Sequence, residues 1–372
     1  MDSFRTEFPL ETGLMYLNHA AVAPWPLRTK RAITLFAEEN THLGATHYPK
    51  WLEVEKTLRG QLRTLINATS TDEIALQKNT SEGLSAIAYG IHWQAGDNVV
   101  ISDQEFPSNR IVWESLASKG VSVNTAQLDA VDPVTCIIDA CTDSTKLISI
   151  SSVQYGTGLK IDLKRLGAFC QERSILFCVD AIQSLGAHAI DVQEINCDFV
   201  VADAHKWMLG PEGIALLYVK KQTLDSLSLH QYGWHMIEKQ GDYDTLSWDI
   251  AKSARRFECG SPNMLGIHGF SASLTLLLEI GIPEVEKMLN EKVEQLITLL
   301  SAKPGIRILS PTAAHLRAGI VTFVSDNIDS ATLHKQLMKK NVICAYRGGG
   351  VRFSPHFYTP EEVLVNAVNL IP

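Results

Sequence analysis

The sequence has no apolar run long enough to cross a bilayer. Its longest largely apolar stretches, such as Leu274–Leu278, fall far short of the roughly 20 residues that a membrane-spanning helix needs. The N-terminal MDSFRTEFPLETG carries acids and lacks the apolar segment of a signal peptide. The seven cysteines are scattered without the spacing of a disulfide scaffold, a metal site or a redox pair. We therefore expect a soluble, cytoplasmic protein with reduced thiols and no membrane partner.

Basic clusters and phosphate-binding glycine motifs are missing as well. The formal net charge is −8, and no stripe of basic and aromatic residues occurs, which argues against a nucleic-acid partner. Neither G-x-G-x-x-G nor G-x-x-x-x-G-K-[ST] is present, so the chain shows no sign of a dinucleotide fold or a P-loop. No cluster of metal-ligating residues appears, and we expect no metal site.

What the sequence does contain is an alternation of strand-like and helical segments from about residue 72 onwards. Strands are expected at 98–102, 146–151, 175–180, 198–202 and 214–219, and helices at 81–91, 109–118 and 163–173. The strand segments are continuously apolar, which is typical of a sheet covered on both faces. Their alternation with helices predicts an α/β fold with a doubly wound, mainly parallel sheet.

The pattern changes beyond about residue 265. Long helices are expected at 265–278 and 284–300, followed by strands at 319–324 and 342–345 with a helix at 330–340 between them. This predicts a smaller C-terminal α+β domain. We place an N-terminal segment that packs with the small domain at 1–20, the large domain at 21–265 and the small domain at 266–372.

Polar residues follow the expected strands at the edge where ligands bind in open α/β sheets. Taken singly, each has an ordinary explanation as a helix cap or a turn residue. The residues expected at this edge after the strands are Glu105, Phe106, Gln154, Tyr155, Asp180, Asp203, His205 and Lys206, and Thr80 and Ser81 join them at the start of a helix.

The combination is more specific than its parts. A desolvated lysine is a usable amine nucleophile and base. The hydroxyls and N–H groups at a helix start can bind a phosphate. With an acid for a pyridinium nitrogen, these groups meet the requirements of pyridoxal 5′-phosphate (PLP). We therefore expect Lys206, Asp180 and the Thr80–Ser81 pair to form a PLP site.

The segment DAIQSLGAHAIDVQEINCDFVVADAHKWMLGPEGIALLYV, at 180–219, resembles the class V aminotransferase family of fold type I PLP enzymes. The resemblance extends from YLNHAA at 16–21 to VRFSPHFYTPEEV at 351–363. The family includes cysteine desulfurases, kynureninase-like enzymes and isopenicillin-N-epimerase-like proteins. It implies a large PLP-binding domain, a small C-terminal domain and a homodimer with shared active sites.

The resemblance also implies individual roles. Lys206 would form the internal aldimine and act as the catalytic base, Asp180 would pair with the pyridine nitrogen, and Gln183 would hydrogen-bond the phenolic oxygen. The other cofactor contacts that it implies are Phe106 stacked on the ring, Thr80, Ser81 and His205 at the phosphate, and Ser261 at the phosphate of the partner subunit. The implied contacts to the amino-acid substrate are Asn18, Gln154, Arg347 and Arg352.

Three positions depart from the desulfurase pattern. Phe106 stands where desulfurases have a histidine, and a phenyl ring cannot transfer a proton. Asp203 stands where many relatives have serine; since an anion beside the phosphate is unfavourable, we expect it to point elsewhere, toward His205. Only GGGV separates Arg347 from Arg352, which leaves no room for the loop that carries the nucleophilic cysteine. Cys344, in the preceding strand-like run, is expected to be buried.

These observations leave the reaction open. We expect an aminotransferase that removes the α-proton of an amino acid. The alternatives are a cysteine or cystine C–S lyase or desulfurase-like enzyme, an epimerase, and a silent PLP-fold binding protein. Two aromatic segments, 44–51 with Tyr48 and 230–235 with Tyr232 and Trp234, either line the site or pack in a dimer interface.

Overall fold

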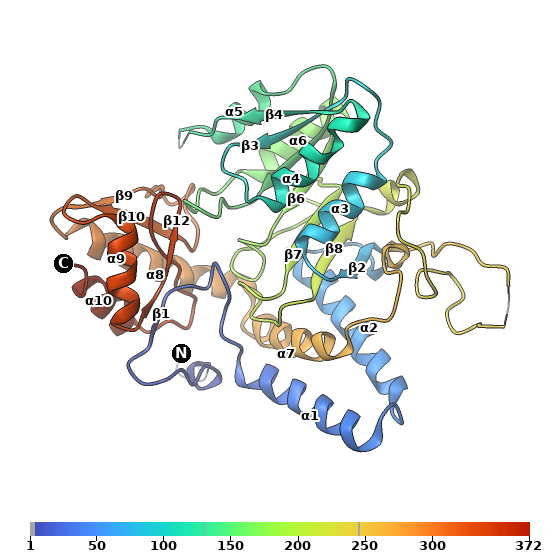
Figure 1. Ribbon diagram of the computed structural model, residues 1–372, viewed down its shortest axis with the longest axis horizontal. Helices are drawn as coiled ribbons and strands as arrows, with labels where there is room; N and C mark the ends of the chain where they lie inside the picture. Colours follow the sequence, from blue (N-terminus) through green and yellow to red (C-terminus); the bar gives the residue numbers. More distant parts are fainter. Residues whose placement is uncertain (1–3, 130, 245) are drawn as a thin grey trace.

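The computed structural model describes residues 4–129, 131–244 and 246–372, shown in Figure 1. Its helices are α1 (Leu27–Leu43), α2 (Tyr48–Leu65), α3 (Thr80–Gly90), α4 (Ser108–Glu114), α5 (Pro133–Asp139), α6 (Leu163–Arg173), α7 (Met264–Ile280), α8 (Ile282–Ser301), α9 (Ser330–Lys339) and α10 (Glu361–Asn369). Its strands are β1 (Met15–Tyr16), β2 (Ile74–Gln77), β3 (Asn98–Ser102), β4 (Ser122–Ala126), β5 (Thr145–Ser151), β6 (Leu176–Asp180), β7 (Phe199–Asp203), β8 (Ala215–Val219), β9 (Ile306–Ile308), β10 (Val321–Ser325), β11 (Val342–Ile343), β12 (Ala345–Arg347) and β13 (Gly350–Phe353).

The larger part of the chain is built on a seven-stranded sheet in the order β2-β8-β7-β6-β5-β3-β4. The strands β7, β6, β5, β3 and β4 are parallel, and β8 runs antiparallel to both of its neighbours, β7 and β2. The five expected strands all form within one residue of their expected ends. The expected doubly wound, mainly parallel α/β fold is confirmed.

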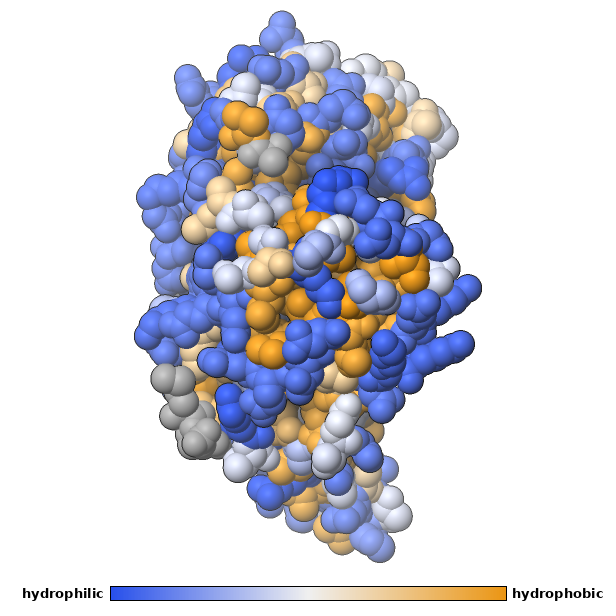
Figure 2. Space-filling view, turned by 90° about the vertical axis from the view of Figure 1, so that its left-hand side faces the viewer, coloured by the Kyte–Doolittle hydropathy of each residue, from blue (hydrophilic) through white to orange (hydrophobic). Residues whose placement is uncertain are grey.

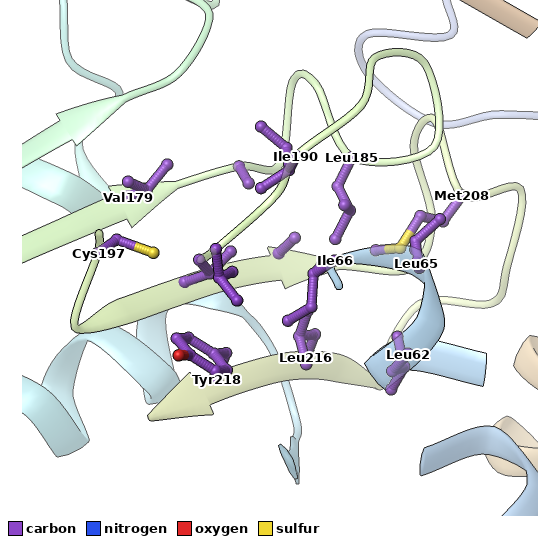
Figure 3. Close-up of a cluster of buried hydrophobic side chains, with 14 of the residues drawn as sticks. Leu62, Leu65, Ile66, Val179, Leu185, Ile190, Cys197, Met208, Leu216 and Tyr218 are labelled. Carbon is purple, nitrogen blue, oxygen red and sulfur yellow. The ribbon is translucent and has the colours of Figure 1, made fainter. Parts of the chain in front are cut away.

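Helices cover this sheet on both faces, which explains why its strands are continuously apolar. In β7, Val200 and Ala202 belong to a core shared with α2, α5, α6 and α7, whereas Phe199 and Val201 belong to a core shared with α3 and α4. In Figure 3, Leu62 and Ile66 of the α2 end lie beside Leu216 of β8. Since successive side chains of a strand point to opposite faces, every position must be apolar.

The C-terminal part forms a second, smaller layer. The antiparallel sheet β12-β13-β10-β9 packs with α8, α9 and α10 around its own apolar core. The chain's N-terminal end joins this part, because β1 pairs in parallel with β11. The expected strand at 342–345 is in fact two short strands, β11 and β12, which belong to different sheets.

Helix α7 corrects the expected boundary at 265/266. It packs against α1 and α2 at the bottom of Figure 1, and its residues Ile267, Phe270 and Leu274 belong to the core of the large sheet. Leu289 and the later apolar residues of α8 belong to the C-terminal core instead. The change from one core to the other therefore falls within α8.

Among the described residues, no single helix is long and apolar enough to span a membrane. The consecutive helices α7 and α8 reach that length only together, and an 82° bend separates them. Figure 2 shows the side of the molecule that lies at the left in Figure 1. On this side, apolar residues gather in the middle of the face and hydrophilic residues surround them.

Candidate active site

A cavity of about 250 Å³ opens at the carboxyl ends of β6 and β7. The connection after β6, the turn after β7, the start of α3 and the loop before α4 all contribute to it. Its lining residues are Ala20, Ala21, Thr80, Ser81, Phe106, Ser108, Tyr155, Asp180, Ile182, Gln183, Asp203, His205, Lys206, Arg347 and Arg352. The fold thus brings together most of the residues that the sequence singles out.

Lys206 lies in the tight connection between β7 and β8. Within this connection, Leu209 adopts a φ of 60°. Gly186, in the segment after β6, packs against it so closely that a Cβ at Gly186 would lie 2.5 Å from the Trp207 carbonyl oxygen. Burial lowers the pKa of Lys206 to about 8, and the nearby Asp180 opposes that shift. A lysine in this state is a usable base and amine nucleophile near neutral pH.

Asp180 is the last residue of β6 and is 2% exposed. Its Oδ1 accepts a hydrogen bond from the Ile182 N–H at 3.1 Å. Burial raises the pKa of this carboxyl to about 7, and Glu105 raises it further, while Lys206 lowers it. A cationic ring nitrogen placed against Asp180 would favour the ionised form.

Gln183 is held from two sides. Its Nε2 donates to the Ala20 carbonyl at 3.0 Å, and its Oε1 accepts from the Trp207 indole N–H at 2.9 Å. An amide nitrogen has two hydrogens, so one N–H is left for a ligand. That remaining donor suits the role predicted for Gln183, a hydrogen bond to a phenolic oxygen.

Asp203 does not point away from the expected phosphate site. Its Oδ1 accepts hydrogen bonds from both the backbone N–H and the hydroxyl of Thr80, the latter at 2.9 Å. Its Oδ2 lies 3.4 Å from Nδ1 of His205, so the expected contact with His205 also exists. The other hydroxyl at the start of α3, Ser81, donates to Ser108 Oγ at 2.8 Å.

Phe106 stands at the mouth of the cavity, with 41% of its surface exposed. Its ring meets Tyr155 edge to face, with centroids 5.2 Å apart, and the Lys206 Nζ lies 5.7 Å from its centroid. Its place on the lining and its open face suit the predicted role as the ring on which a planar cofactor stacks.

Glu105 is a buried carboxylate behind the cavity to which the sequence analysis assigned no role. Its oxygens accept five hydrogen bonds, from Ser102 Oγ, Gln154 Nε2, Asn109 Nδ2 and both the N–H and the hydroxyl of Ser151, at 2.5–3.2 Å. The bond from Gln154 orients that amide, and its buried Oε1 has no hydrogen-bond partner in the described part of the chain. The only sequence signal for this role is the position of the acid three residues after the end of the buried strand β3, next to Phe106.

Arg352 is a nearly buried cation on β13. One of its nitrogens donates to the Tyr155 carbonyl at 2.6 Å, but Nε has no partner among the described residues, and no described carboxylate forms an ion pair with it. Burial lowers the pKa of Arg352 to about 10, and the charge of Arg347 adds to the effect. An unpaired buried guanidinium is unfavourable until an anion binds, which suits a substrate carboxylate.

The two arginines flank a two-residue hairpin turn. Gly348 and Gly349 have φ values of 61° and 79°, as such turns require, and Arg347 pairs with Gly350. A Cβ at Gly348 would lie 2.4 Å from the Gly156 carbonyl oxygen, so the turn sits against the loop that carries Tyr155. The turn has no space for a longer loop with a cysteine.

All seven cysteines lie in the described part of the chain, and none lines the cavity. Cys344 belongs to the C-terminal core, and burial raises the pKa of its thiol to about 12. A thiol in this state is a poor nucleophile.

Three predicted site residues, Asn18, Gln154 and Ser261, lie outside the cavity lining. Asn18 forms a parallel bridge with Ser354, and its buried Oδ1 has no hydrogen-bond partner among the described residues. Ser261 is exposed in a separate cavity that Lys78 and Glu82 also line. The aromatic segments 44–51 and 230–235 do not line the active-site cavity either.

The donor set around the cavity fits PLP. Two buried polar atoms of the lining have no hydrogen-bond partner among the described residues, namely Arg352 Nε and His205 Nδ1, which Asp203 Oδ2 approaches only to 3.4 Å. Buried polar atoms are normally satisfied, so unpaired ones around a cavity indicate a missing ligand. When PLP is bound, Lys206, Asp180 and Phe106 would hold its aldehyde carbon, ring nitrogen and ring face.

Known proteins resemble this chain along its length. The family model described as aminotransferase class-V matches residues 15–357. A probable cysteine desulfurase of Methanothermobacter thermautotrophicus is 31% identical over 97% of this chain and 95% of its own length. The uncharacterized aminotransferase YcbU of Bacillus subtilis is 30% identical over 100% of this chain and 97% of its own length.

Solved structures show the same fold. The cysteine desulfurase CsdA of Escherichia coli has a TM-score of 0.88 at 21% identity, over 99% of this chain and 96% of its own. The protein C-DES, with glycine covalently linked to its PLP cofactor, has a TM-score of 0.91 at 21% identity, over 98% of both chains.

Proposed function

Because this chain belongs to the class V aminotransferase family of PLP-dependent enzymes, we propose that it cleaves the C–S bond of a cysteine-derived amino acid, such as cystine, by β-elimination. The observation that carries the proposal is the combination of Phe106 at the mouth of the cavity with the absence of any cysteine from its lining. The site can remove an α-proton, but Phe106 itself cannot donate a proton to a departing sulfur, and no cysteine lines the cavity to accept a transferred one.

Bound PLP supplies an electron-withdrawing ring that acidifies the α-C–H of an attached amino acid. Lys206 removes that proton, since a pKa of about 8 leaves part of the amine neutral near pH 7.5. Arg352 binds the α-carboxylate through its free nitrogen and so orients the α-C–H toward Lys206.

The leaving group must then depart by itself. The Cβ–S bond breaks with its electron pair on sulfur, and the phenyl ring of Phe106 has no proton to give to it. Departure is faster for a less basic sulfur, and the persulfide released from cystine is a more stable anion than a simple thiolate. One water molecule from solvent then hydrolyses the remaining three-carbon enamine, so cystine and water give cysteine persulfide, pyruvate and ammonia.

The relatives support this reaction over the aminotransferase that the sequence analysis put first. Several carry cysteine desulfurase as their name, and one solved neighbour of the same fold is a cystine C–S lyase bound to its product cysteine persulfide. Transamination is supported by the name of the family and by that of YcbU.

The test is to incubate the PLP-loaded protein with cystine and, separately, with cysteine. We expect pyruvate and persulfide from cystine without any added 2-oxo acid, and slower release from cysteine. Lys206→Ala should abolish pyruvate release. Cys344→Ala, which removes the cysteine nearest in sequence to the two arginines, should not. The proposal fails if the cofactor instead converts to its amine form and turnover requires a 2-oxo acid.

A further inference from the structure

Helix α3 begins at the cavity, where the hydroxyls and first N–H groups of Thr80 and Ser81 would hold the cofactor phosphate. Two of these donors are already taken, because Asp203 Oδ1 accepts both the N–H and the hydroxyl of Thr80. The contact is reciprocal, since the Asp203 N–H donates to Thr80 Oγ1 at 3.1 Å. A carboxylate therefore occupies part of the donor set that a phosphate would use.

The charges around Asp203 do not neutralise it fully. His205 Nδ1 is 3.4 Å from its Oδ2, but burial lowers the pKa of His205 to about 4, so the ring is neutral. Lys206 is the favourable neighbour, whereas Glu212 and Asp180 are like charges. Glu82 is a further acid in the first turn of α3, and its carboxylate accepts a hydrogen bond from the Lys78 backbone N–H.

We propose that Asp203 competes with the cofactor phosphate at the start of α3, so that PLP binds with uptake of one proton and is held less tightly as the pH rises. The proton comes from solvent and is shared by the carboxylate and the phosphate, because two anions in one site cannot both remain fully ionised. Protonated Asp203 can donate to a phosphate oxygen, whereas the ionised form repels it. Burial already raises the pKa of Asp203 before any phosphate binds. This inference concerns the cofactor alone and does not depend on the reaction proposed above.

Pyridoxal, which lacks the phosphate, separates this effect from the titration of Lys206. Both compounds react with the same lysine, so the ratio of their dissociation constants cancels its pH dependence. We would titrate the apoprotein with PLP and with pyridoxal between pH 7.0 and 8.5, following absorbance and tryptophan fluorescence. Asp203→Asn keeps an acceptor for Thr80 and removes the charge, and Asp203→Ser is a smaller replacement. Glu212→Gln removes a nearby acid that does not touch Thr80 and serves as the matched control.

In the wild type, the preference for PLP over pyridoxal should fall as the pH rises. At pH 8.5, Asp203→Asn and Asp203→Ser should prefer PLP over pyridoxal on the order of tenfold more strongly than the wild type does, and this ratio should change little with pH. Glu212→Gln should follow the wild type. Circular dichroism melting shows whether each variant is folded. If the folded Asp203 variants bind PLP no more tightly than the wild type relative to pyridoxal, Asp203 supports the phosphate site and the inference is wrong.

Discussion

The indole N–H of Trp207 donates a hydrogen bond to Oε1 of Gln183 at 2.9 Å, across the base of the cavity. Trp207 follows Lys206 in the chain and is buried in the C-terminal core, and His356 lies 3.1 Å from its carbonyl oxygen. The turn that carries Lys206 is thereby fixed to the large sheet on one side and to the C-terminal part on the other. This contact holds both the expected nucleophile and an expected cofactor ligand in place.

Trp207→Phe should therefore affect both stability and the cofactor. It keeps most of the packing but leaves the buried Gln183 oxygen unpaired, which should lower the free energy of unfolding by about 1–3 kcal/mol. Urea unfolding measures the loss, and the visible spectrum of bound PLP should shift. Trp93→Phe is the control, because it removes an indole bond to the Ala88 carbonyl far from the cavity. A similar spectral shift in Trp93→Phe would contradict the assignment.

Capture of PLP by the apoprotein should depend on pH through Lys206. The neutral amine is the nucleophile, and burial lowers the pKa of this lysine to about 8. The rate should therefore rise with pH and level off above about pH 8, well below the usual pKa of a lysine. Stopped-flow absorbance gives the profile, and Lys206→Arg should show no capture. A rate that still rises steeply at pH 10 would show that Lys206 has an ordinary pKa.

Glu105 should act as a positioning residue. Glu105→Gln replaces one carboxylate oxygen, which accepts hydrogen bonds, with an amide group that can only donate them. The neighbouring donors lose an acceptor, so the free energy of unfolding should fall by about 1–3 kcal/mol. Because Gln154 loses its fixed orientation, we expect a higher KM in addition to a lower kcat. Glu114→Gln, on an exposed pair with Arg110, should change stability by less than about 0.5 kcal/mol. An unchanged KM in a folded Glu105→Gln would leave Glu105 with a structural role only.

We further propose that two copies of the chain share their active sites. Ser261 lies outside the cavity of its own chain, and the long connection between β8 and α7, which extends from the body in Figure 1, exposes Tyr232 at 62% and Trp248 at 55%. Light scattering should give twice the chain mass, and Tyr232→Asp with Trp248→Asp should give monomers that bind PLP weakly. Monomers with full PLP affinity would refute the shared site. Ser261→Ala should weaken PLP binding without dissociating the dimer.

The sequence by itself determined five of the seven strands of the large sheet and indicated which polar residues lie at its edge. A continuously apolar strand is stable only where both faces of its sheet are covered. This pattern predicted β3, β5, β6, β7 and β8 to within one residue at each end. Because ligands bind at the carboxyl ends of such strands, Asp180 and Lys206 could be expected at one edge without knowing the order of the strands.

The tertiary structure decided what depends on contacts between distant parts of the chain. The hydrogen bonds from Thr80 to Asp203 and from Gln154 to Glu105 join different strand ends, and only the order and register of the sheet bring them together. The assignment of α7 to the large core follows from its packing against α1 and α2, which its own periodicity does not reveal. A side chain's type indicates which chemistry is possible, but the neighbours that share its hydrogen bonds and charge are set by the fold.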